Sequence, residues 1–79
     1  MPIAIKLSHL KNGQSSTISQ ILLPSTETDR LSVMGIYIGK KIIKKHAQPL
    51  GGPVSVQMDG SIVALSSRLA AKIMVQPDE

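Results

Sequence analysis

Residues that favour tight turns recur along this chain at intervals of about ten residues. The turn-forming sites are Asn12-Gly13, Pro24, Gly35, Gly39, Pro49–Pro53, Asp59-Gly60 and Pro77. The segments between them are rich in isoleucine, valine and leucine, and β-branched side chains favour strands over helices. This pattern predicts a mainly β protein, a small barrel of five or six strands.

One segment departs from the strand pattern and carries the signals of a short helix. Ser25 or Thr26 can cap its start, the latter as part of an approximate capping box. Leu31 and Met34 then form a narrow apolar stripe, and Gly35 follows as a residue that can adopt the left-handed conformation. We therefore expect one short helix from Thr26 to Met34, ended by Gly35 at positive φ.

The segment Lys40–Ala47 has no purely apolar face. As a strand it would place Ile42, Lys44 and His46 on one face, and Ile43, Lys45 and Ala47 on the other. We expect a strand that bends or carries a β-bulge; a helix is the competing interpretation, since lysines recur there four residues apart. The other predicted strands are Ile3–Leu7, Ser16–Leu22, Val54–Met58, Ile62–Leu65 and Lys72–Val75, with single helical turns at Ser8–Lys11 and Arg68–Ala71.

Length and composition predict a single domain over residues 1–79. The chain has no cysteine and only one aromatic residue, Tyr37, so its core must be almost wholly aliphatic. The N-terminus lacks a signal-peptide pattern, and no apolar run approaches the roughly 20 residues of a membrane span. We therefore expect a cytoplasmic location. The net charge of +4 permits an acidic partner, nucleic acid or an anionic membrane surface, and selects none of them.

Motifs that would carry catalysis or bind a cofactor are absent or broken. The segment Gly35–Lys40 is one residue short of a phosphate-binding loop and lacks its final serine or threonine. His9 and His46 lie far apart in sequence, and neither has a carboxylate at metal-ligand spacing. The acidic residues fall in a helix start, a turn and the C-terminal tail, which leaves no paired carboxylates. We expect no enzyme activity, no metal site and no cofactor.

Four lysines form the one concentrated charge feature of the sequence: Lys40, Lys41, Lys44 and Lys45. The first interpretation is a solvated strand whose charges prevent edge-to-edge pairing. The competing interpretation is a docking patch for an acidic protein surface or for phosphates. Nucleic-acid binding is the weaker version of the second interpretation, because proteins that bind single strands use aromatic side chains for base stacking.

The joint spacing of several glycines and aliphatic residues resembles the FeoA family of ferrous-iron uptake proteins. The matching residues are Arg30-Leu31, Met34-Gly35-Ile36, Gly39, Ile42, Pro49–Val54, Val56, Val63-Ala64-Leu65 and Ile73-Met74-Val75. The resemblance implies an SH3-like barrel with a short helix between its early strands. Two positions depart from the family pattern. Lys44 stands where an apolar residue is usual, so its stem would have to run along the barrel, and Ser66-Ser67 stand where arginine is common.

The family resemblance implies an accessory or regulatory role beside FeoB, a membrane ferrous-iron transporter with a cytoplasmic GTPase region. The expected partner is that cytoplasmic region, so that contact with the membrane is indirect. The candidate contact residues are the four lysines together with Pro49, Leu50, Gly51 and Gly52. The alternatives are a basic barrel that binds nucleic acid and a structural module that forms homo-oligomers through open sheet edges.

Overall fold

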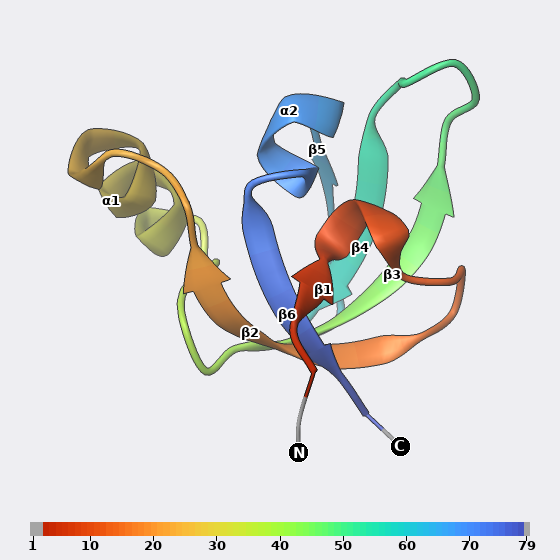
Figure 1. Ribbon diagram of the computed structural model, residues 1–79, viewed down its shortest axis with the longest axis horizontal. Helices are drawn as coiled ribbons and strands as arrows, with labels where there is room; N and C mark the ends of the chain where they lie inside the picture. Colours follow the sequence, from red (N-terminus) through yellow and green to blue (C-terminus); the bar gives the residue numbers. More distant parts are fainter. Residues whose placement is uncertain (1–2, 79) are drawn as a thin grey trace.

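Six antiparallel strands form one curved sheet in the computed structural model, which describes residues 3–78 (Figure 1). The strands are β1 (Ile5–Lys6), β2 (Ser15–Ile21), β3 (Lys41–Ala47), β4 (Val54–Met58), β5 (Ser61–Leu65) and β6 (Ile73–Pro77). Their order across the sheet is β1-β6-β2-β3-β4-β5. The predicted mainly β fold, a six-stranded SH3-like barrel with a short helix, is confirmed.

Three short helical segments connect the strands. They are the 3-10 turn η1 (Leu7–His9), the helix α1 (Ser25–Val33) and the four-residue helix α2 (Ser67–Ala70). Figure 1 shows α1 standing to one side of the barrel, and α2 lying over the end of the sheet. Within residues 3–78, none of these helices has the length and apolar character that crossing a bilayer requires.

The core is aliphatic, as composition requires. On β4 the buried residues alternate with half-buried ones, so one face of the strand points inward. Tyr37 is exposed and takes no part in the core. The buried apolar residues are Leu7, Leu10, Ile18, Leu31, Ile36, Ile42, Val54, Val56, Met58, Leu65, Ala70, Ile73 and Val75.

The C-terminus of α1 ends in a complete Schellman motif. The amide of Ile36 donates to the carbonyl oxygen of Leu31 at 2.9 Å, and the amide of Gly35 donates to that of Ser32 at 3.0 Å. Gly35 has a φ of 91°, as predicted. Leu31 and Ile36 are both buried, which supplies the hydrophobic contact that accompanies this motif. The motif therefore ends the helix and anchors it to the core.

The N-terminus of α1 differs from the prediction. The helix begins at Ser25, and its cap position, Pro24, makes no side-chain hydrogen bond, so the expected caps at Ser25 and Thr26 are wrong. The carbonyl oxygen of Pro24 accepts from the amide of Thr28 at 3.0 Å, which starts the first turn one residue early. The hydroxyl of Thr28 donates to the carbonyl of Leu23 at 3.3 Å instead of capping.

The β3 strand carries the expected bulge, and the helical interpretation of this segment is wrong. Lys44 pairs with Val56 and His46 pairs with Ser55, so that Lys45 is the extra residue. The Asp59-Gly60 turn between β4 and β5 is also confirmed, with φ values of 49° and 81°. The first strand is shorter than predicted, because the chain turns into η1 at Leu7.

Gly35→Val should lower the free energy of unfolding by about 1–2 kcal/mol, and the Tm by roughly 4–16 °C. A Cβ at Gly35 would meet nothing within 4 Å, so the cost comes from the left-handed backbone alone. Gly35→Asn is the matched control and should lose less, because asparagine tolerates this conformation. Thermal unfolding followed by circular dichroism measures both variants; equal stability of the valine variant and the wild type would contradict this account.

Candidate docking surface

The β3–β4 hairpin ends in a tight, closed loop, Pro49–Gly52, which we call the hairpin tip. The amide of Gln48 donates to the carbonyl of Pro53 at 3.0 Å and closes the base of the loop. A Cβ at Gly52 would lie 2.5 Å from the Cβ of Gln48, so only glycine lets the two arms approach this closely. The hairpin tip is therefore a tight turn with a defined conformation.

Leu50 stands at this tip in a conformation that is costly for leucine. Its φ is 61°, and Gly51 beside it has a φ of 75°. The Leu50 side chain is fully exposed, at 104% of the reference area, the highest value among the large apolar residues. Left-handed conformations cost a non-glycine residue about 1–2 kcal/mol. The strained backbone and the exposed apolar side chain together make Leu50 a candidate contact residue.

The four lysines do not form one surface, contrary to the docking patch considered from the sequence. Lys41 and Lys45 are exposed, and Lys40 is partly covered. Lys44 is 5% exposed and shares the inward face of β3 with Ile42. The alternation of side chains along a strand separates these neighbours, so Lys44 is unavailable to a partner.

The Lys44 ammonium fastens the N-terminal part of the chain to β3. Its Nζ donates to the carbonyl oxygen of Leu10 at 2.6 Å and to that of Ser8 at 3.0 Å. The backbone of Lys44 adds two further bonds, because its amide donates to Gln14 O at 3.1 Å and its carbonyl accepts from Gly13 N at 2.6 Å. The expected path of the Lys44 stem along the barrel thus ends at buried carbonyls, and its role is structural.

Two of the other lysines are engaged in ion pairs. Lys40 pairs with Asp59, and its Nζ lies 5.8 Å from the centroid of the Tyr37 ring. The hydrogen bond with Asp59 raises the pKa of Lys40 above its ordinary value. Lys41 Nζ lies 2.9 Å from Asp78 Oδ2, and this hydrogen bond lowers the pKa of Asp78.

Lys45 differs from the other three lysines. It occupies the bulge, is exposed, and has no ion-pair partner among residues 3–78. It belongs to the hairpin that carries the tip, so Lys45 and the hairpin tip are the predicted contact residues that the structure leaves available together.

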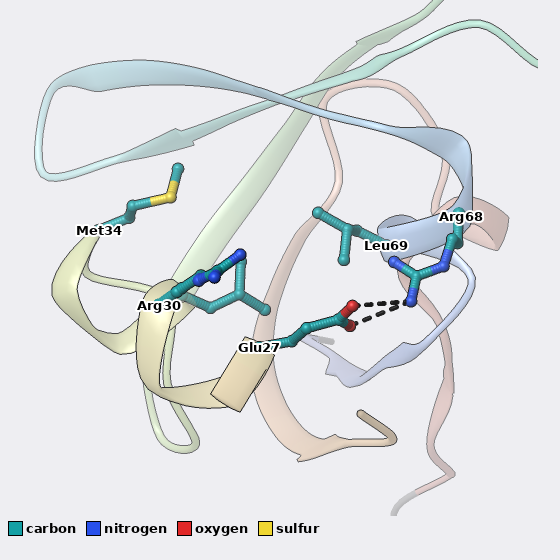
Figure 2. Close-up of a pocket in the computed structure, with 6 residues that line it drawn as sticks. Glu27, Arg30, Met34, Arg68 and Leu69 are labelled. Atoms are coloured by element: carbon teal, nitrogen blue, oxygen red, sulfur yellow. Dashed lines mark hydrogen bonds and ion pairs between the residues drawn. The ribbon is translucent and has the colours of Figure 1, made fainter. Parts of the chain in front are cut away.

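A second feature, which sequence reasoning missed, is a groove of about 240 Å³ between α1 and α2 (Figure 2). Leu31 and Leu69 provide apolar surface, while an ion pair joins the two helices. Arg68 Nη2 lies 2.9 Å from Glu27 Oε1 and 3.1 Å from Oε2. The residues that line the groove are Glu27, Arg30, Leu31, Met34, Arg68 and Leu69.

Both walls of the groove come from short helices whose ends are fixed locally. Ser66 caps α2, since its Oγ accepts from the amide of Leu69 at 3.2 Å. Figure 2 shows Arg30 extending from α1 and Met34 from the turn that ends it, with Leu69 and Arg68 extending from α2. No local sequence pattern predicts that α1 and α2 line one groove, because strands β3, β4 and β5 separate the two helices in the sequence.

Residues 3–78 contain no group of three or more histidine, aspartate or glutamate side chains placed to hold a metal ion. His9 and His46, the histidines of the sequence, are both exposed.

Lys44→Met should lower the free energy of unfolding by about 1.5–3 kcal/mol, because it leaves the carbonyls of Ser8 and Leu10 without their charged donor. Lys45→Met, the same change at the neighbouring exposed residue, should stay within about 0.5 kcal/mol of the wild type. Urea denaturation measures both. Similar stabilities for the two variants would show that the buried ammonium contributes nothing.

The Asp78 carboxyl should titrate below its ordinary range, and Lys41→Gln should raise its pKa back toward that range. Because the pKa of Asp78 is lower in the folded state than in the unfolded state, its ionised form stabilises the fold. This stabilisation is fully present at pH values above the unfolded-state pKa, and it is lost as the pH falls through the folded-state pKa. Carboxyl-carbon NMR titration checks the direction. The Lys40→Gln variant is the control, because Lys40 pairs with Asp59 and should leave Asp78 unchanged.

Comparison with known proteins assigns the chain to a family. The family model described as the FeoA domain matches residues 5–77. A protein of Methanocaldococcus jannaschii that bears the name Fe(2+) transport protein A is 36% identical over 73 residues, which cover 92% of this chain and 87% of the relative.

Solved structures agree with the family match. The crystal structure of an iron uptake regulatory protein, FeoA, superposes with a TM-score of 0.83 at 25% identity, over 96% of this chain and 99% of that chain. The solution structure of FeoA from Chlorobium tepidum gives a TM-score of 0.84 at 28% identity, over 95% of this chain and 74% of that one. Because the family match spans the whole barrel, from β1 to β6, this chain belongs to the FeoA family, which is involved in ferrous iron transport.

Proposed function

We propose that this protein is a small cytoplasmic accessory or regulatory protein of ferrous-iron uptake, which binds the cytoplasmic GTPase region of a FeoB-type transporter and catalyses no reaction itself. Membership of the FeoA family supports a role in ferrous-iron uptake. The observation that carries the binding mode is Leu50, fully exposed and held at positive φ on a closed loop. Such a residue is suited to insert into an apolar depression on a partner.

Lys45 and Leu50 on the hairpin have different proposed roles in binding. Lys45 is an exposed cation without an ion-pair partner in the described part of the chain, so it can attract an acidic face. Rim charges act mainly on the association rate and its salt dependence, whereas a buried apolar anchor acts on the dissociation rate. The tip itself is uncharged, and burying it on a partner needs no desolvation of an ion.

The ionic groups support a binding role over catalysis. Glu27, Asp59 and Asp78 each form an ion pair with a basic side chain of the same chain, so these carboxylates serve structural contacts. Nucleic acid is a poorer fit than a protein partner, because Lys40 and Lys41 are committed to carboxylates and Tyr37 is the sole aromatic. Phosphate contacts and base stacking would need more free cations and more aromatic side chains.

Leu50→Asn should weaken binding to the soluble cytoplasmic region of the transporter, while the fold becomes no less stable. Asparagine accepts the left-handed conformation and removes the apolar contact, so affinity and stability should change in opposite directions. Calorimetric titration at low salt gives the affinity, and thermal unfolding gives the stability. Ile62→Asn, at another exposed aliphatic residue, is the control and should bind like the wild type.

Lys45→Glu should slow association and flatten its salt dependence, with a smaller effect on dissociation. Kinetic binding measurements separate the two rates. Wild-type affinity in both Leu50→Asn and Lys45→Glu would refute this contact surface, and no binding at low salt would refute the partner.

A further inference from the structure

We propose that the hairpin tip of one molecule docks in the α1–α2 groove of a second copy, so that this protein self-associates head to tail. In this contact the second copy contributes Leu50 to a groove that is otherwise open. The proposal rests on the complementarity of two features of the same chain: an exposed apolar projection and an apolar recess. It stands independently of binding to a transporter.

The groove suits an uncharged aliphatic side chain. Leu31 and Leu69 give it apolar surface, and Met34 adds a flexible thioether side chain that is half exposed and can adapt to what enters. The one ion pair at the groove, Glu27–Arg68, is already satisfied within the molecule. An occupant with its own charge would have to compete with that pair, whereas a tip made of proline, leucine and glycines does not.

The hairpin tip and the groove also carry complementary hydrogen-bonding groups. The carbonyl oxygens of Leu50 and Gly51 accept no hydrogen bond within the described chain, so the tip presents free acceptors beside its apolar side chain. Arg30 lines the groove and forms no ion pair with residues 3–78. Its guanidinium group is a donor that can meet these carbonyls once Leu50 is seated.

The placement of the two surfaces determines the type of assembly. In Figure 1 the β3–β4 connection and α1 stand on different sides of the barrel, so the tip cannot fill the groove of its own molecule. A contact between two different surfaces uses the tip of one molecule and the groove of the other, so the pair keeps one free groove and one free tip. Repetition of this contact gives a closed ring or an open chain of copies. Docking would also cover Leu50 and compete with any other partner of the tip.

The first test is the mass of the purified protein, without transporter, across concentrations from low micromolar to near millimolar. Sedimentation equilibrium should show a weight-average mass that rises above the monomer value of 8.4 kDa. Leu50→Asn should remain monomeric, because its tip lacks the apolar side chain. Met34→Glu should also remain monomeric, because it places a charge in the groove. Val33→Glu changes the adjacent residue, which is 89% exposed and outside the groove, and should associate like the wild type.

Mixing the two monomeric variants gives the sharpest result. Leu50→Asn retains an intact groove and Met34→Glu retains an intact tip, so an equimolar mixture should form dimers and nothing larger. This complementation distinguishes a head-to-tail contact from association through sheet edges, which neither variant alters.

A mixture that stays monomeric, or equal effects of Met34→Glu and Val33→Glu, would overturn the proposal. So would a wild type that is monomeric at every concentration. If the wild type is monomeric and Met34→Glu weakens binding to the transporter region, the groove belongs to a transporter segment and not to a second copy.

Discussion

The bulge at Lys45 is the constraint on which the β3–β4 hairpin depends. Without it, His46 would follow Ile42 and Lys44 onto the inward face, and Ala47 would point to solvent. The extra residue reverses this alternation, so that His46 is exposed and Ala47 packs against the core beside Val54, its partner across the strands. The same bulge places Lys45 on the exposed surface of the hairpin, where it has no ion-pair partner within residues 3–78.

Lys44, one residue earlier, shows how the barrel uses a charge where an aliphatic side chain would also fit. An ammonium group in the interior loses hydration, and it is tolerated here because two carbonyl oxygens replace water. These acceptors come from η1 and the residue after it, so the long side chain ties a short, weakly structured segment to a central strand. In a domain of this size, which buries only about 60% of its unfolded surface, such a tie matters.

The contrast between predicted and unpredicted features follows the range of the interactions involved. Gly35, the Asp59-Gly60 turn and the Ser66 cap could be predicted from sequence, since their hydrogen bonds or dihedral angles are decided within a few residues. The start of α1 was missed, although it is local, because the hydroxyl side chains of Ser25 and Thr26 indicated caps, whereas the observed cap residue is Pro24, which has no side-chain acceptor. The groove and the carbonyl partners of the Lys44 ammonium could not be predicted, because the groups involved are brought together only by the folded barrel.

Leu50 links the energetics of the fold to its surface chemistry. Its backbone conformation costs about 1–2 kcal/mol, an appreciable part of the stability of a small domain. No contact inside the described chain offsets this cost, because the side chain is fully exposed. A glycine or asparagine would satisfy the turn with less strain, so the requirements of the turn do not explain why leucine stands there. The proposed contact with an apolar recess outside the molecule would supply the missing reason, since the closed, uncharged loop holds the Leu50 side chain fully exposed.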